Sequence, residues 1–283
     1  MKRVFLATLL AALPFAGPAA DAAKAKQWLS QAQAAYSAGK VDEALKFATD
    51  AVAADPQNAE ALYVRARLHE ARNDHAKAVA DYSEVIKLTP DAAGLYQRRG
   101  TEHFKLGNIK ESIADFDKFI SLAPGQEPHH WQRGISYYYA GRYEDGRKQF
   151  ESHQTVNQND VENAVWHFLC VARQHGVDKA RAALIKIESD RRVPMMQIYA
   201  LYAGRGTVNE VMDAVRAGNP GPGELNFRQF YANLYLGLYY EVTGEAKAAR
   251  EHITKAAKDY KLDHYMWDVA RVHVQLLEAK AVK

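Results

Sequence analysis

The pattern that decides the fold is most complete in residues 93–124, AGLYQRRGTEHFKLGNIKESIADFDKFISLAP. Gly107 divides this stretch into two parts, and glycine is the residue that best supplies the left-handed backbone of a turn after a helix. Pro124 ends the second part, because proline lacks an amide donor and clashes with a preceding helical turn. The stretch therefore predicts two antiparallel helices joined by a tight turn.

The same pattern recurs along the chain with a period of 34 residues. Prolines, small residues, aromatic residues and turn glycines all follow this one period, which is the signature of a repeat architecture. The columns are Pro56/Pro90/Pro124, Ala66/Gly100/Gly134, Ala44/Ala78/Ser112/Gly146, Tyr82/Phe116/Phe150 and Gly107/Gly141. We place four repeats at residues 25–58, 59–92, 93–126 and 127–160, with Gln158 where a fourth proline would fall.

Each repeated column has a physical cause. The small residues allow the two helices of a repeat to approach closely. Apolar residues recur at three- and four-residue steps within each part, as in Val79, Tyr82 and Ile86, which predicts amphipathic helices.

These columns resemble the tetratricopeptide-repeat (TPR) family, whose pattern is an aromatic residue, Leu-Gly, Tyr, Ala, an aromatic residue and Pro at fixed offsets. The resemblance implies an all-α solenoid of helical hairpins that winds into a right-handed superhelix. It also implies that the chain holds other proteins or peptides and does not catalyse a reaction.

Three arginines stand in one column of the repeats, at Arg65, Arg99 and Arg133. One reading is a ladder that binds an anionic partner. The other is an ion pair inside each repeat, because Asp81 and Asp115 follow the first two arginines by 16 residues. We expect the ion pair.

Beyond residue 160 the period fades, although helix signals continue. Asp160 is a good N-cap, Pro194 forces a break, and Thr207 to Glu210 has the spacing of a capping box. The expected elements are degenerate helical repeats over 161–218 (helices at 161–174, 178–188, 195–203 and 207–217), a Pro/Gly linker at 219–223, a TPR-like hairpin at 230–263 within the segment 224–283, and a capping helix at 264–279.

The C-terminal hairpin carries a second resemblance. Residues 235–240, YLGLYY, and 243–246, TGEA, resemble bacterial envelope TPR proteins of the new-lipoprotein-I type. That resemblance implies an adaptor that brings cell-wall hydrolases and a protease together and forms a homodimer. The lipid-bearing cysteine of those proteins has no counterpart here.

The first 22 residues are expected to be a secretory signal peptide. Lys2 and Arg3 precede an apolar run at 4–13, and Ala20 and Ala22 are small residues at cleavage-site spacing. We therefore expect a secreted or periplasmic protein, with no lipid anchor and no membrane span. The net charge of +3 includes the signal peptide and gives no argument for nucleic acid.

His167 and Cys170 form the best candidate for chemistry. They lie one helical turn apart, so a thiol nucleophile with a histidine base, a zinc site and simple packing are all conceivable. We expect packing, with no catalytic residue, metal or cofactor. Arg191 and Arg192 could anchor a carboxylate of a partner, or could cap the end of a preceding helix.

The predicted binding surface is a concave groove rich in aromatic residues. Its residues are Tyr36, Tyr63, Arg67, Arg98, Phe104, Trp131, Ile135, Tyr138, Tyr139 and Trp166. The alternative is that these rings pack on one another or on the helices after residue 160. Leu29 and Gln33 replace the Lys and Asn with which some TPR domains hold a C-terminal carboxylate, so we do not expect that clamp.

The sequence thus favours a scaffold or adaptor that binds protein or peptide partners, including cell-envelope hydrolases or proteases. Two other functions remain open: an enzyme centred on His167 and Cys170, and a structural subunit that assembles with copies of itself.

Overall fold

The computed structural model describes residues 21–281, so the expected signal peptide lies outside it except for Asp21 and Ala22. The first helix, α1, begins at Ala22, and the Asp21 side chain accepts a hydrogen bond from the backbone amide of Lys24. The expected cleavage point after Ala22 therefore falls within the first turn of α1.

The first half of the chain consists of consecutive helical hairpins, as the period predicts. The helices are α1 (Ala22–Ser37), α2 (Val41–Ala54), α3 (Ala59–Ala71), α4 (His75–Leu88), α5 (Ala93–Lys105), α6 (Ile109–Leu122), the short 3-10 helix η1 (Pro124–His129), α7 (Trp131–Tyr139) and α8 (Tyr143–Gln154). Helices α2, α4 and α6 each end two residues before a proline of the repeated column. Proline therefore sets the length of the second helix in each of these hairpins.

The second half is also helical in the described residues. Its helices are α9 (Val161–His175), α10 (Val177–Ala182), α11 (Met195–Tyr202), α12 (Val208–Arg216), α13 (Pro222–Thr243), α14 (Ala246–Lys258) and α15 (Tyr265–Ala281). The expected N-cap of Asp160 and the capping box of Thr207 and Glu210 are both present. No helix within residues 21–281 combines the length and apolar character that crossing a membrane requires.

The two helices of a hairpin touch at the column of small residues. A Cβ atom added to Gly134 would lie 2.7 Å from the ring of Phe150, and one added to Gly100 would lie 2.8 Å from the ring of Phe116. Both distances are shorter than a carbon–carbon contact allows. Glycine is therefore required at these positions by the facing ring and not by the backbone conformation.

The arginine column forms ion pairs within the repeats. Arg65 and Arg99 each make a two-pronged contact, to Asp81 and Asp115 respectively, with shortest distances of 2.6 Å. Arg133 instead pairs with Asp117 at 2.7 Å and donates to the Gln149 side chain. These arginines tie two helices together and do not form a free ladder.

The prediction of a helix at residues 178–188 is correct only for its N-terminal part. Helix α10 ends at Ala182, and no helix is assigned from residue 184 to residue 191. Ile187 is buried there, and its backbone amide donates to the hydroxyl of Tyr199. The sequence pattern predicts helical hydrogen bonds for this segment. The segment instead buries one apolar side chain, and its backbone amides bond to neighbouring side chains.

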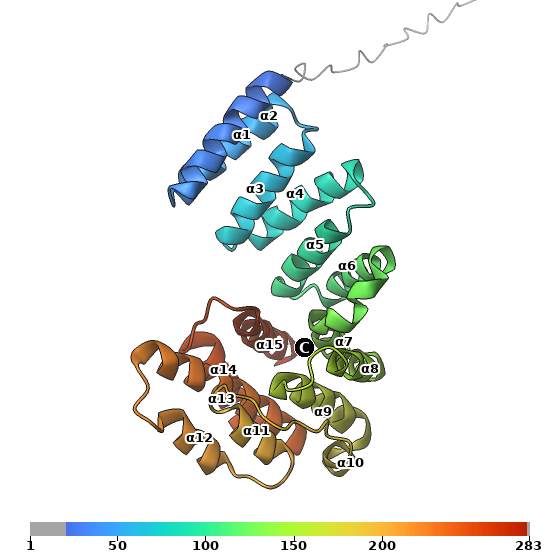
Figure 1. Ribbon diagram of the computed structural model, residues 1–283, viewed down its shortest axis with the longest axis vertical. Coiled ribbons are helices and arrows are strands. Elements are labelled where there is room, and N and C mark those ends of the chain that lie inside the picture. The colour runs from blue at the N-terminus through green and yellow to red at the C-terminus, as the bar shows by residue number, and fades with distance from the viewer. Residues whose placement is uncertain (1–20, 282–283) are drawn as a thin grey trace, which may run out of the picture.

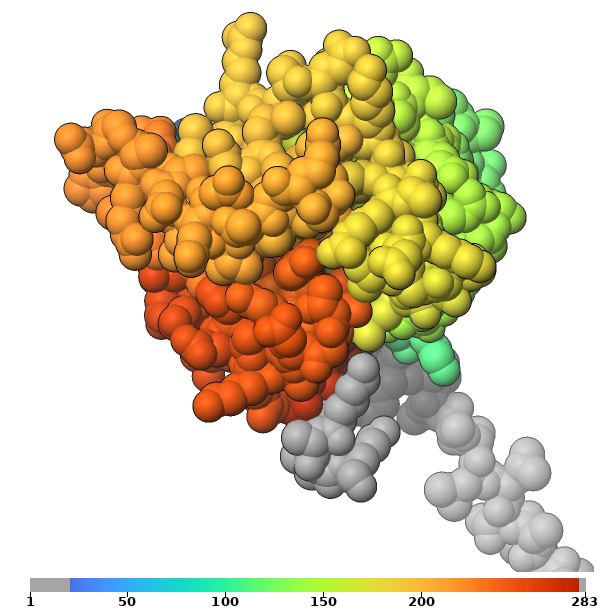
Figure 2. Space-filling view, turned by 90° about the horizontal axis from the view of Figure 1, so that it is seen from below, coloured from blue at the N-terminus to red at the C-terminus, as the bar shows by residue number. Residues whose placement is uncertain are grey.

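The expected linker at residues 219–223 does not separate two units. Helix α13 already begins at Pro222, a position that suits proline at the start of a helix. Helix α13 packs against α9, α11, α12 and α14, and one buried cluster extends from Phe104 to Val274. Figure 2 shows the yellow to red residues of this second half forming one continuous end of the molecule.

Helix α15 does more than cap the last hairpin. It packs on α14 and also reaches back to α5, although about 160 residues separate α5 from α15 in the sequence. Figure 1 shows α15 beside α7 and α9, while the hairpins α1–α4 extend away from this body as an arm.

We predict that Gly134→Leu lowers the free energy of unfolding by about 1–3 kcal/mol, because the new side chain meets the ring of Phe150. Urea unfolding followed by circular dichroism measures this. The matched control is Gly94→Leu, since a Cβ at Gly94 meets no atom within 4 Å. Equal stability of the two variants would contradict the close approach of α7 and α8.

Candidate binding site on the concave face

Helix α15 fills the second half of the predicted groove. The ring of Tyr265 stacks on Phe104 with a centroid distance of 5.2 Å and meets Trp131 edge-on at 5.3 Å. These aromatic contacts join the start of α15 to α5 and α7. Aromatic pairs of this geometry add to the stabilisation that burial itself gives.

Polar contacts fix α15 against the C-terminal end of α5. Arg271 donates to the carbonyl of Lys105 at 2.6 Å, and Gln275 donates to the carbonyl of Leu106 at 3.2 Å. The last carbonyls of a helix have no partner inside it, and a cation suits that end of the helix dipole. On α7, the Tyr139 hydroxyl lies 3.1 Å from Nδ1 of His273. Helix α15 therefore satisfies groups that α5 cannot satisfy alone.

This packing corrects the predicted binding surface for its second half. Phe104, Ile135, Tyr138 and Trp166 are at most 4% exposed, so they do not form an open binding surface. Trp131 and Tyr139 are half-buried and contact Tyr265 and His273 of α15. In this second half of the groove, the rings pack on one another and on later helices, as the alternative interpretation of the sequence predicts.

The first half of the groove stays open. Tyr36 of α1 is 47% exposed, and Tyr63 and Arg67 of α3 lie beside it. Together with Ala32, Gln33, Val64 and Leu68 they line a cavity of about 180 Å³ between the first helices of two successive repeats. Arg67 also lines this cavity and donates to the Tyr63 hydroxyl at 3.4 Å. Aromatic and basic groups are thus presented on one surface.

Arg98 of α5 continues this surface. Its guanidinium lies 6.0 Å from the ring centre of Tyr63 and 3.3 Å from a carboxylate oxygen of Glu70. Arg67 shares the same carboxylate oxygen at 2.9 Å. Two guanidinium groups on one carboxylate leave an excess of positive charge, which suits an acidic group of a partner. The structure therefore brings together four of the ten predicted residues.

The environment of Cys170 favours packing. Its thiol is fully buried, burial raises its pKa, and Gly146 faces its sulfur so closely that an added Cβ would lie 2.8 Å away. A protonated buried thiol is a poor nucleophile and a poor metal ligand. The nearby His167 is directed to Glu151, at 3.3 Å, and burial lowers its pKa. The described residues give no support to an enzyme centred on this pair.

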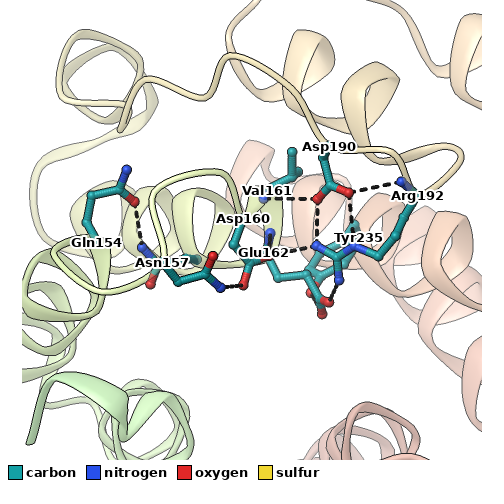
Figure 3. A network of polar contacts seen from close by, with 9 residues as sticks. Gln154, Asn157, Asp160, Val161, Glu162, Asp190, Arg192 and Tyr235 are labelled. Atoms are coloured by element: carbon teal, nitrogen blue, oxygen red, sulfur yellow. Dashed lines mark hydrogen bonds and ion pairs between the residues drawn. The ribbon is translucent and has the colours of Figure 1, made fainter.

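Arg192 is the centre of a partly buried polar network that the sequence did not reveal (Figure 3). It contacts Asp190 at 2.6 Å, Asp160 at 2.7 Å, and Glu162. Asp190 also accepts from the backbone amide of Val161, so the network ties the extended segment to the start of α9. The guanidinium of Arg192 thus does not cap a preceding helix, and its charge is paired within the chain. Arg191 is exposed.

Glu162 connects this network to α13, because the Tyr235 hydroxyl donates to its carboxylate at 2.5 Å. Burial raises the pKa of Glu162 to about 7, and the Asp160 carboxylate adds to that rise against the opposing ion pair with Arg192. The signal that could have found Glu162 is its place two residues after the N-cap of α9, where acidic side chains suit the helix dipole.

Comparison with known proteins agrees with this architecture. Two tetratricopeptide-repeat models match the chain, one over residues 29–93 and the other over residues 93–126. A solved tetratricopeptide repeat protein from Parabacteroides merdae is similar over 90% of this chain and 98% of its own length, with a TM-score of 0.59 and 14% identity. MamA of Desulfovibrio magneticus is similar over 56% of this chain and 90% of its own, with a TM-score of 0.51 and 19% identity.

Among curated proteins, the Hsp70-Hsp90 organizing protein of Triticum aestivum is 36% identical over 89 residues. The match covers 31% of this chain and only 14% of that protein. The chain is thus an all-α TPR solenoid, and TPR proteins act as protein-binding scaffolds.

We predict that Glu162→Gln changes how stability depends on pH. Because the pKa of Glu162 is raised from 4.5 to about 7, the folded protein holds an extra proton between these values. The stability that this bound proton contributes is present at low pH, and it is lost as the pH rises through about 7. The wild type should therefore lose stability relative to the variant between about pH 5 and 8, on the order of 2 kcal/mol.

Urea unfolding at several pH values measures this difference. Comparing two proteins removes the contribution of buried histidines such as His130, whose lowered pKa acts in the opposite direction. Glu188→Gln, at an exposed carboxylate, is the control. A difference that stays constant over this range would refute the raised pKa.

Proposed function

We propose that this protein is a scaffold outside the cytoplasm that holds a segment of a partner protein in the open half of its concave face. The observation that carries the proposal is the division of the groove by α15. The covered half shows that a helix fits against the inner face of these repeats, through aromatic stacking and hydrogen bonds to helix ends. The uncovered half offers the same kinds of group to another chain.

The open half defines the chemistry of the partner segment. Tyr36 and Tyr63 offer aromatic area beside the cavity of about 180 Å³, which suits an apolar side chain. Arg67 and Arg98 share a single carboxylate, that of Glu70, and so suit an acidic side chain. We infer a segment in which an apolar anchor lies near an Asp or Glu residue.

A location in the bacterial envelope rests on the N-terminal sequence, in which two basic residues precede an apolar run. The resemblance of residues 235–246 to envelope adaptors of the new-lipoprotein-I type supports the same location. Cell-wall hydrolases and proteases are therefore the first partners to test.

We predict that Tyr63→Ala weakens partner binding by about 2 kcal/mol or more, since aromatic residues at the centre of an interface contribute most to affinity. Affinity capture from the native envelope identifies the partner, and calorimetry with that purified partner gives the affinity. Stability should change little, because Tyr63 is only partly buried.

The control is Tyr260→Ala, which removes the same side chain between α14 and α15, outside the open groove. Equal affinity of both variants for the partner would refute the groove as the binding surface. Arg98→Ala should separately weaken binding and reduce its dependence on salt.

A further inference from the structure

The aromatic pair that contacts the start of α15 recurs, uncovered by α15, two repeats earlier in the chain. Tyr265 of α15 contacts Phe104 of α5 and Trp131 of α7, with centroid distances of 5.2 Å and 5.3 Å. A step back of 68 residues, two periods of the repeat, leads from these two rings to Tyr36 of α1 and Tyr63 of α3. Stacked repeats place such residues in equivalent positions. Tyr36 and Tyr63 are therefore a second aromatic pair of the same kind.

The pair is specific to these two registers of the repeat. In the register between them, Glu70 and Gln97 stand at the equivalent positions. Tyr36 and Tyr63 line the cavity of about 180 Å³, and Tyr36 is 47% exposed. Engineered apolar cavities of about 150 Å³ bind benzene. The cavity beside the two tyrosines therefore has room for an aromatic ring.

The helix end that receives α15 is also repeated. Arg271 of α15 donates to the carbonyl of Lys105, the last residue of α5. Two repeats earlier the last residue of α1 is Ser37, and no group within residues 21–281 donates to its carbonyl. The last carbonyls of a helix need donors from outside it. The carbonyl of Ser37 is therefore available for the bond that Arg271 makes at the end of α5.

The turn after α1 leaves space for a helix. A Cβ atom added to Gly107, in the turn after α5, would lie 3.0 Å from the Gln275 side chain of α15. One added to Gly39, the equivalent glycine after α1, would meet no described atom within 4 Å. The two glycines have nearly the same left-handed backbone, with φ of 78° and 74°. The turn after α1 thus has the conformation against which α15 packs, without the helix.

One difference between the two registers defines the partner. Ile135 of α7 and Met266, the second residue of α15, line one cavity in the covered half. Two repeats earlier, Arg67 stands in place of Ile135. Arg67 and Arg98 share the carboxylate of Glu70, so one positive charge is left over. An acidic side chain in place of Met266 would meet this charge.

An acidic residue at that position also suits the bound helix. The first turn of a helix lies at the positive end of its dipole, and α15 itself carries Asp268 there. The groove and the helix thus favour the same charge at the same place. The same difference disfavours α15 of a second copy as the occupant, because its Met266 would face Arg67.

We propose that the open half of the groove binds the N-terminal turns of a partner helix, in the way that the covered half binds α15. An aromatic residue of the partner packs against Tyr36 and Tyr63. The next residue is Asp or Glu and pairs with Arg67, and a basic residue six positions after the aromatic donates to the carbonyl of Ser37. This inference rests on the proposed function and adds to it the helical form and the order of the side chains.

The test is calorimetric titration of the mature chain with a designed helical peptide, acetyl-SYEAAAARAAAQAAK-amide. Its serine caps the helix and its alanines favour it. Tyrosine, glutamate, arginine and glutamine have the spacing of Tyr265, Met266, Arg271 and Gln275 in α15. We expect saturable binding with a Kd on the order of 0.1 mM.

Matched peptides separate the parts of the proposal. Alanine in place of the tyrosine, or methionine in place of the glutamate, should weaken binding about tenfold, because each change removes one anchoring group. Alanine in place of the arginine should weaken binding about threefold. Proline two residues before the arginine keeps every anchoring side chain but breaks the helix, and it should weaken binding about tenfold or more.

A variant of the protein tests the order of the side chains. Arg67→Ile introduces the residue of the covered half, so the methionine peptide should now bind more tightly than the glutamate peptide. Arg67 is exposed, and circular dichroism should show an unchanged fold. Arg250→Ile, at an exposed arginine of α14, is the matched control and should keep the order of the wild type.

The proposal is overturned if the designed peptide does not bind, if the proline peptide binds equally well, or if Arg67→Ile leaves the order of the two peptides unchanged. A dimer of the chain that Tyr63→Ala dissociates would assign the groove to a second copy and would also overturn it. The proposed function is tested separately, because equal affinity of the captured partner for Tyr63→Ala and Tyr260→Ala refutes it whatever the peptides do.

Discussion

The structure depends on a contact between a residue with little or no side chain and a large residue that follows it by 16 positions. Gly100 faces Phe116 and Gly134 faces Phe150, and a Cβ atom on either glycine would overlap the ring. The pair recurs in the last hairpin, where a Cβ on Gly237 would lie 2.3 Å from Ile253. Because these hairpins close in this way, successive hairpins stack, and their first helices form a continuous inner face.

The inner face has two parts, one covered by α15 and one left uncovered. Helix α15 covers the part formed by α5, α7 and α9, where Phe104 and Trp131 contact Tyr265. The part formed by α1 and α3 keeps Tyr36 and Tyr63 beside an open cavity. One chain thus combines an aromatic half that its own last helix covers with a half that this helix leaves uncovered.

Local features were predictable from the sequence and distant contacts were not. The hairpins, the pairing of Arg65 with Asp81 and the caps at Asp160 and Thr207 follow from patterns within one repeat or one helix turn. The position of α15 depends on the curvature of the whole stack, which no periodicity encodes, so buried residues such as Phe104 were assigned to an open groove. The sequence predicted a helix where the segment before Arg192 is extended. Contacts of Asp190 and Arg192 with the start of α9 hold this segment, and helix propensity carries no information about such contacts.

The central claim is that α15 lies against the inner face of the repeats in the folded protein. The most direct measurement is the nuclear Overhauser effect between the ring protons of Tyr265 and those of Phe104 and Trp131, in protein with selectively labelled aromatic residues. With centroid distances of 5.2 Å and 5.3 Å, both cross-peaks should be observed, and Tyr265→Leu should remove them. Absence of these cross-peaks, together with rapid amide exchange along α15, would show that the helix is detached and would contradict the division of the groove.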